Sequence, residues 1–144
     1  MREVTLDASV VVKWFRSIDE ECLAQAAQLR SDFEGGALHV TAPSLLYLEI
    51  LNAAGRRWGW SERQLSDLAD AISDLDFEIL TPDPQSLAPW IAVGLTAYDA
   101  TYVAVAASSG AELITADREI LAVAGDLATD LADEEMRQAA DSEE

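Results

Sequence analysis

Hydrophobic and polar positions follow two periods along this chain. In short stretches such as "REVTLD" (residues 2–7) apolar and polar side chains alternate, which is typical of a strand. Elsewhere apolar residues recur every three or four positions, which is typical of an amphipathic helix. Strands are predicted over residues 2–7, 37–43, 77–80 and 112–115 and shortly after 126, and helices over residues 9–15, 18–33, 44–57, after Ser61, 85–95, 97–109 and 118–125.

Two of these helices carry more specific expectations. The segment 18–33 has apolar residues at helical spacing (Cys22, Ala26, Leu29 and Phe33) and ends at a pair of glycines. The segment 44–57 is apolar on nearly every face, so we expect it to be buried.

The order of the elements predicts the fold class. Strands that alternate with helices form a parallel α/β sheet covered by helices on both faces. With 144 residues and 50% hydrophobic content, one compact domain is expected over residues 1–130. Residues 126–144 hold eight acidic residues and one arginine, so residues 131–144 are expected to be a flexible, solvated acidic tail.

Composition narrows the class of protein. No apolar run reaches the roughly 18 residues that span a membrane, and the N-terminal residues lack the apolar core of a secretory signal. Cys22 is the only cysteine, so a disulfide framework and a cysteine-based zinc site are excluded, and Cys22 is expected to be a small buried side chain. A cytoplasmic protein with no membrane contact is the expectation.

Net charge raises an objection to nucleic acid as a partner. The chain carries 27 acidic and 9 basic residues, a formal net charge of −18, and Lys13 is its only lysine. This balance resembles the solvated surface of halophilic proteins, although a GC-rich genome also depletes lysine. Phosphate binding normally requires a basic face, so a nuclease reading has to explain the acidic surface.

Three carboxylates stand alone in apolar segments. Asp99 is the only charged residue among the 21 residues 90–110, where the average composition predicts about five. Asp7 is alone between Glu3 and Lys13, and Glu49 is alone between Pro43 and Arg56. A fourth acid, Asp117, lies where a buried strand is expected to end.

Helix capping is the competing explanation for these acids. Asp7 and Asp117 each follow a strand and precede a helix, and Thr96 and Asp99 have the spacing of a capping box. Glu49 lies more than one turn inside its helix and cannot cap it. An isolated carboxylate in an apolar helix costs several kcal/mol unless a cation or hydrogen-bond donors compensate it.

A shared cation would offset the electrostatic cost of placing all four carboxylates in apolar surroundings. Strand ends of a parallel sheet meet at its carboxyl edge, where α/β proteins bind ligands. Oxygen ligands without histidine or cysteine favour Mg²⁺ or Mn²⁺ over zinc. Such an ion neutralises phosphate oxygens and activates water, which indicates phosphate chemistry and supplies the positive charge that the surface lacks.

At this point the sequence resembles the PIN-domain nucleases, and within them the VapC-type toxins of type II toxin–antitoxin systems. The resemblance runs over about residues 3–130 and rests on "LDAS", "LEILNA", "TAYDATYVAVA" and "LITAD". It implies a three-layer fold with four or five parallel strands, Mg²⁺- or Mn²⁺-dependent endoribonuclease activity, a homodimer and a cognate antitoxin. The family's metal-binding acids match Asp7, Glu49, Asp99 and Asp117, and its supporting polar positions match Ser9, Asn52 and Thr115.

The chain departs from the family pattern in its strongly acidic charge and its acidic tail. Basic and aromatic residues that could contact RNA or a protein partner are Lys13, Arg16, Arg56, Arg57, Trp58 and Trp60. Core packing, a helix C-terminus that favours cations and solvated surface positions are the alternatives for these residues. His39, the only histidine, is expected to be structural.

Three rival functions remain to be weighed. A phosphoacceptor receiver domain also gathers acids at a sheet edge, but it requires a lysine after a late strand, where this chain has "TADR". A catalytically inactive acidic module that binds proteins would not need all four acids. An RNA-processing nuclease without an antitoxin keeps the same fold and site, and only the genetic neighbourhood distinguishes it from a toxin.

Overall fold

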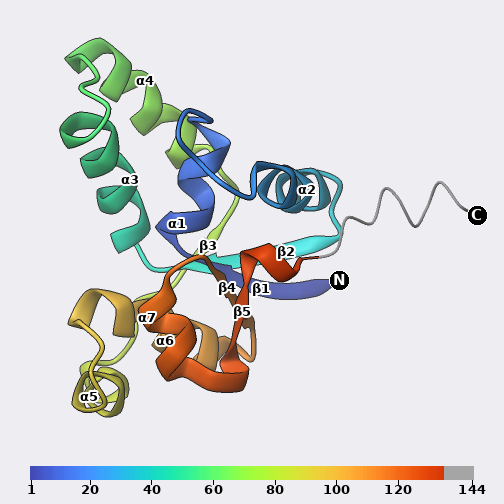
Figure 1. Cartoon of the computed structure of the whole chain (residues 1–144), viewed down its shortest axis with the longest axis vertical. Coiled ribbons are helices and arrows are strands. Elements are labelled where there is room, and N and C mark those ends of the chain that lie inside the picture. Colours follow the sequence, from blue (N-terminus) through green and yellow to red (C-terminus); the bar gives the residue numbers. More distant parts are fainter. Residues whose placement is uncertain (135–144) are drawn as a thin grey trace, which may run out of the picture.

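The computed structural model describes residues 1–134 and contains one parallel sheet of five strands (Figure 1). The strand order is β3-β2-β1-β4-β5, and every neighbouring pair runs parallel. The α/β fold class predicted from the alternating elements is therefore confirmed. The strands are β1 (Arg2–Leu6), β2 (Leu38–Ala42), β3 (Glu78–Ile79), β4 (Glu112–Thr115) and β5 (Ala128–Asp130).

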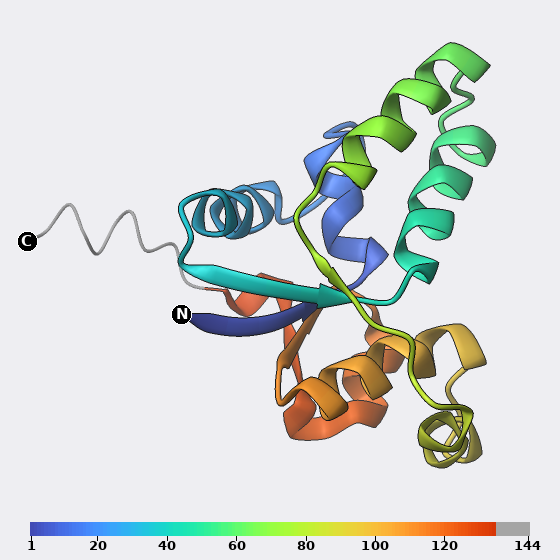
Figure 2. The same ribbon diagram turned by 180° about the vertical axis from the view of Figure 1, so that it is seen from behind.

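Helices cover both faces of the sheet and give three layers. Figures 1 and 2 show α1 to α4 on one face and α5 to α7 on the other, with α3 and α4 projecting from the sheet as a pair. The helices are α1 (Ala8–Val11), α2 (Leu23–Glu34), α3 (Leu45–Arg56), α4 (Glu62–Ser73), α5 (Pro84–Ala92), α6 (Ala97–Ser109) and α7 (Arg118–Ala124), with short 3-10 turns η1 (Val12–Trp14), η2 (Gly125–Leu127) and η3 (Leu131–Asp133).

Helix α6 lies directly against the central strands. It contacts β1, β2 and β4, and all of its side chains from Tyr102 to Ala106 are buried. Alanines at positions 100, 104 and 106 keep the helix surface small, so that its backbone can approach the central strands closely. The helix ends at Gly110, whose φ of 63° suits glycine.

The predicted start of the helix over residues 18–33 is wrong. Helix α2 begins at Leu23, because Asp19 and Cys22 adopt left-handed backbone conformations with φ of 60° and 57° that interrupt a right-handed helix. Cys22, expected to be a small buried side chain, is half-buried at the N-cap position of the helix.

The expectation that helix 44–57 is buried on all sides is also wrong. One face of α3, formed by Leu46, Ile50, Ala53 and Ala54, is buried against the core. The opposite side faces solvent, and Leu48 on it is 64% exposed. The helix projects from the sheet and packs on α4 (Figure 2).

The strand order creates a crevice at the carboxyl edge of the sheet. From β1 the chain proceeds outward to β2 and β3, then crosses back to place β4 on the other side of β1. The connections that leave β1 and β4 therefore diverge to opposite faces of the sheet. Ligands of open α/β sheets bind at such a reversal point, and Asp7 and Asp117 follow the two strands that flank it.

The ordered packing continues past residue 130. Leu131, in η3, is fully buried, and the Glu134 carboxylate lies 2.8 Å from the guanidinium of Arg2. The remainder of the expected acidic tail, residues 135–144, lies outside the described residues. Within residues 1–134 no single helix is long and apolar enough to cross a membrane; α5 and α6 reach that length and composition only as a pair bent by 117°.

Replacing Leu131 by alanine should lower the free energy of unfolding by about 2–5 kcal/mol, because a fully buried leucine leaves a cavity. Urea denaturation followed by circular dichroism measures the change. The exposed neighbour Ala132, replaced by serine, is the control and should alter stability by less than about 0.5 kcal/mol. Equal stability of Leu131→Ala and the control would show that η3 is not part of the core.

Candidate active site

Asp7 is a buried carboxylate held by two hydroxyl groups. It follows β1 and is only 4% exposed. Ser9 donates to its Oδ1 at 2.6 Å, and Thr115, the last residue of β4, donates to its Oδ2 at 2.5 Å. Although Asp7 stands at the N-cap position of α1, its side chain makes no capping bond, so capping does not explain its presence.

The same two hydroxyls are fixed by the backbone that follows β4. Ser9 Oγ accepts the backbone N–H of Ala116 at 2.9 Å, and Thr115 Oγ1 accepts the backbone N–H of Asp117 at 2.9 Å. Each hydroxyl thus donates to Asp7 and accepts from the loop that carries Asp117. This arrangement joins the ends of β1 and β4.

Glu49 is held from the opposite face of the sheet. It lies on α3, and the hydroxyl of Tyr102 on α6 donates to its Oε1 at 2.5 Å. Tyr102 is 2% exposed, and burial together with the neighbouring Glu49 raises its pKa, so this hydroxyl keeps its proton and remains a donor. The bond compensates the cost of the isolated carboxylate that the sequence displays.

Asp99 lies in the first turn of α6, and Asp117 is the N-cap residue of α7. Thr96 Oγ1 accepts the backbone N–H of Asp99 at 3.1 Å, which begins α6. Asp117 caps α7, because its Oδ1 accepts the backbone N–H groups of Glu119 and Ile120 at 2.9 and 3.0 Å. The capping interpretation is thus correct for Asp117, whose second carboxylate oxygen has no role in the cap.

Charge repulsion connects the four acids. Burial raises the pKa of Asp7 to about 6; the charges of Asp117 and Glu49 act in the same direction, while the hydroxyls of Ser9 and Thr115 act against it. Burial also raises the pKa of Asp99 to about 6, again with contributions from Asp117 and Glu49. The structure therefore brings the four acids near enough to repel one another.

The carboxylates are nevertheless not arranged as a ready coordination shell. Within residues 1–134, no three acidic, histidine or cysteine side chains lie close enough to hold one metal ion. Both oxygens of Asp7 and one oxygen each of Glu49 and Asp117 instead accept hydroxyl or backbone donors. The donor chemistry, carboxylate and hydroxyl oxygen alone, is that which Mg²⁺ and Mn²⁺ prefer, and the mutual repulsion would be relieved by a cation.

An open pocket of about 220 Å³ lies beside Glu49. Its polar lining comes from Ser9, Glu49, Asn52 and Arg57, and its apolar lining from residues of α1, η1 and α3. The structure thus places Ser9 and Asn52, two expected supporting residues, in one pocket with an expected metal-binding acid.

Two basic residues lie elsewhere. Lys13 forms an ion pair with Glu20 at 3.0 Å and its side chain is only 8% exposed, so it does not face the solvent as a phosphate contact would. His39 lies on β2 between Glu3 and Glu78, and its hydrogen bond to Glu3 raises its pKa. These contacts hold neighbouring strands together, in keeping with the structural role expected for His39.

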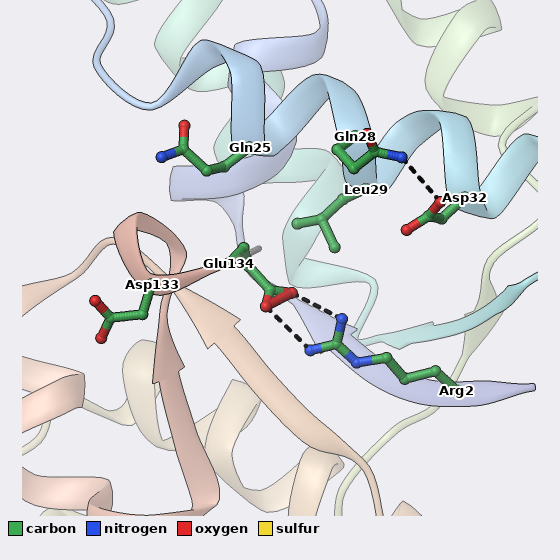
Figure 3. Close-up of a pocket in the computed structure, with 7 residues that line it drawn as sticks. All are labelled: Arg2, Gln25, Gln28, Leu29, Asp32, Asp133 and Glu134. Atoms are coloured by element: carbon green, nitrogen blue, oxygen red, sulfur yellow. Dashed lines mark hydrogen bonds and ion pairs between the residues drawn. The ribbon is translucent and has the colours of Figure 1, made fainter. Parts of the chain in front are cut away.

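A second pocket, of about 300 Å³, lies away from the four acids (Figure 3). Arg2 at the start of β1 and residues of α2 and the η3 region line it. Figure 3 shows its interior occupied by the ion pair between Arg2 and Glu134, while Gln28 binds Asp32 on its wall. The ion pair of Arg2 with Glu134 joins β1 to the η3 region, which indicates a structural contact.

Sequence reasoning missed Tyr102. An aromatic residue in the apolar segment "YVAVA" is typical of the core, which concealed its hydroxyl. Its position provides the missing signal, because Tyr102 lies three residues after Asp99 and therefore on the same side of α6. Tyr102 and Asp99 thus lie on the side of α6 that faces the other acids at the carboxyl edge.

The comparisons with known proteins agree with this geometry. The PIN domain family matches residues 4–126, so the chain belongs to the PIN-domain family. Within it, the chain is similar to a VapC-type protein of Pyrobaculum aerophilum called exonuclease VapC9, with 35% identity over 101 residues that make up 65% of this chain and 76% of the relative. The crystal structure of PAE2754 from the same organism is also similar, with 27% identity, a TM-score of 0.65 and 96% of each chain covered.

Replacing Thr115 by valine should lower the free energy of unfolding by about 1.5–3 kcal/mol at pH 8, because a hydrogen bond to a buried carboxylate is lost. The hydroxyl lowers the pKa of Asp7, so its removal raises that pKa further, and the loss should be smaller at pH 5, where Asp7 is largely protonated. Thr5→Val, which removes a buried hydroxyl bonded to Thr41, is the control; it should cost about 1 kcal/mol at both pH values.

Replacing Asp99 by asparagine should stabilise the metal-free protein at pH 8. The folded-state pKa of Asp99, about 6, lies above its ordinary value of 3.8, so ionisation destabilises the fold progressively between about pH 4 and pH 6. Asparagine avoids this cost, which screening at a part-exposed site limits to about 1 kcal/mol. Urea unfolding in EDTA should show the gain at pH 8 and none below pH 4.

The exposed acid Asp70 on α4 provides the matched control for that experiment, since Asp70→Asn makes the same charge change away from the site. A pH-independent difference between Asp99→Asn and the wild type would contradict the assigned repulsion.

Proposed function

We propose that this PIN-domain protein is a Mg²⁺- or Mn²⁺-dependent ribonuclease that hydrolyses internal phosphodiester bonds of RNA. The observation that carries the proposal is that Asp7, Glu49, Asp99 and Asp117 come from four separate parts of the chain and lie near enough to one another that burial, together with their charges, raises the pKa of Asp7 and of Asp99 to about 6. The hydroxyl donors offset this cost only in part, and a cost of this kind favours a function that requires the charges.

The residues around the acids support a division of labour. Asp7, Glu49, Asp99 and Asp117 would hold the ion, which when bound neutralises phosphate oxygens and lowers the pKa of water. Ser9 and Thr115 keep Asp7 oriented, and Tyr102 fixes one oxygen of Glu49. Asn52, one turn beyond Glu49, lines the pocket beside it and supplies an amide for the substrate or for bound water.

The mode of cleavage needs a direct test, because the similar protein of Pyrobaculum aerophilum is called an exonuclease. The pocket beside Glu49 is open, as is required for a strand to pass through without presenting an end. We therefore assign endonucleolytic cleavage to this chain and make a circular substrate part of the experiment.

A toxin–antitoxin role follows from the similarity to a VapC-type protein. In this role the chain acts in the cytoplasm as a homodimer and is inhibited by a cognate antitoxin. Exposed apolar side chains on and next to the contacting helices α5 and α6, namely Ile91, Val93 and Tyr98, support a protein interface there. RNA processing without an antitoxin is the second candidate, and a neighbouring gene for a DNA-binding partner would favour the toxin.

Purified protein should cleave RNA with Mg²⁺ or Mn²⁺ and lose the activity in EDTA. Asp99→Asn should reduce the rate by at least about a hundredfold while the protein remains folded, because a carboxylate is required at the site. Asp70→Asn should retain the wild-type rate. Assays at low and high KCl measure whether the acidic surface requires salt for folding or for RNA binding.

The substrates should be one RNA sequence in linear, end-labelled form and in circular form. Cleavage of the circle is expected from an endonuclease, whereas mononucleotide release from the linear form alone would show an exonuclease. Wild-type rates for Asp99→Asn, or activity that survives EDTA, would refute the proposed metal-dependent site and favour an inactive module that binds proteins.

A further inference from the structure

The distribution of unpaired cations is unusual for so acidic a chain. Residues 1–134 contain eight lysine and arginine residues, and five of them form ion pairs with carboxylates: Arg2, Lys13, Arg30, Arg63 and Arg118. The three described cations without such a pair are Arg16, Arg56 and Arg57. These three arginines have no carboxylate ion pair within the described residues although the chain holds 27 acidic residues against 9 basic ones.

One of these three arginines lines the proposed active site, and a second contacts the residue that follows it. Arg57 lines the same pocket as Glu49, Ser9 and Asn52. Arg16, which follows η1, places its guanidinium 5.3 Å from the centre of the Trp58 ring. Trp58 directly follows Arg57, so Arg16 is held against the segment that carries Arg57.

Structural roles account for only part of this arrangement. Cations are favourable at the C-terminus of a helix, which explains Arg56 at the end of α3. That effect does not explain why the Arg57 side chain lines a pocket with Glu49, nor why Arg16, from another segment, lies over the ring of Trp58. The cation–π contact with Trp58 orients Arg16 without neutralising its charge.

We propose that Arg57 and Arg16 form a phosphate-binding subsite that guides single-stranded RNA into the pocket beside Glu49. The inference rests on the ribonuclease function proposed above and adds the path of the substrate. Guanidinium groups match phosphate geometry, and Trp58 with Trp60, whose rings lie 5.1 Å apart, provides aromatic surface of the kind on which unpaired bases stack.

An RNA backbone accounts for the position of the subsite better than an acidic protein segment does. Arg57 lines the same pocket as Glu49 and Asn52, so a phosphate held by Arg57 would lie beside the proposed metal-binding acid. A polyanion is repelled by the acidic surface, so cations that no carboxylate neutralises are the groups that favour its approach, and Arg57 is such a cation inside the pocket.

RNA binding should be measured in the Asp99→Asn background, in which the ligand is not cleaved. The probe is a fluorescently labelled, unstructured RNA of about 12 nucleotides, titrated by anisotropy between about 50 and 500 mM KCl. Arg57→Gln and Arg16→Gln should each weaken binding by roughly five- to tenfold at low salt. Each should also reduce the slope of log affinity against log salt by about 0.7, because one phosphate contact is lost.

Arg63→Gln is the matched control, because Arg63 is highly exposed on α4 and makes only a loose contact of 4.0 Å with Asp67. It should retain the affinity and the salt slope of the parent. Urea unfolding of all three variants verifies that they are folded. Binding by Arg57→Gln and Arg16→Gln equal to that of Arg63→Gln would overturn the proposal.

A polyglutamate peptide in the same titration distinguishes a protein partner from RNA. If both substitutions weaken only the peptide, the surface binds an acidic protein and the proposal is wrong. Cleavage assays of the same variants with Asp99 restored separate the two hypotheses. If Arg57→Gln cleaves RNA at the wild-type rate with an unchanged KM, the proposed subsite is wrong and the proposed nuclease function stands. If RNA binding depends on Arg57 but the wild type cleaves no RNA, the nuclease function is wrong and the binding site stands.

Discussion

The buried carboxylate of Asp7 is the constraint on which the architecture of the site depends. A charge with 4% exposure at the junction of β1 and β4 is tolerable only because two hydroxyls donate to it. Those hydroxyls are in turn held by the backbone N–H groups of Ala116 and Asp117. The same two hydroxyl groups therefore orient Asp7 and fix the backbone that carries Asp117. This is possible because β1 and β4, which are far apart in sequence, are neighbours in the sheet.

Helix α6 positions Tyr102 and Asp99, and it can do so because its small side chains let it lie close to the sheet. Its alanines allow the helix to lie against the central strands, and this depth allows Tyr102 to reach Glu49 on the other side of the sheet edge. The same helix carries Asp99 in its first turn. Apolar packing thus fixes where the polar groups meet, while their mutual repulsion lowers the stability of the fold.

Features that stand out against apolar sequence could be predicted, whereas contacts between distant segments could not. Carboxylates such as Asp7 and Glu49 are conspicuous in sequence because nothing else near them is charged, and strand–helix alternation is sufficient for the parallel sheet. Hydrogen bonds between residues 108 positions apart depend on strand order, which periodicity does not encode. The predicted start of α2 was wrong for a similar reason. Ile18 and Cys22 continue the helical pattern in the sequence, but the backbone at Asp19 and Cys22 is left-handed, and sequence periodicity does not reveal this.

The acidic composition and a polyanionic substrate are compatible because charge acts locally. Screening confines the field of an exposed carboxylate to about 8–10 Å at moderate salt, so net charge governs approach from a distance and individual groups govern contact. Ion pairs neutralise most described arginines where acids surround them, whereas Arg16 is held by the π face of Trp58, which orients a cation and leaves its charge available. An aromatic partner in place of a carboxylate is thus a way in which a chain of charge −18 keeps the charge of an arginine unneutralised, as the proposed phosphate subsite requires.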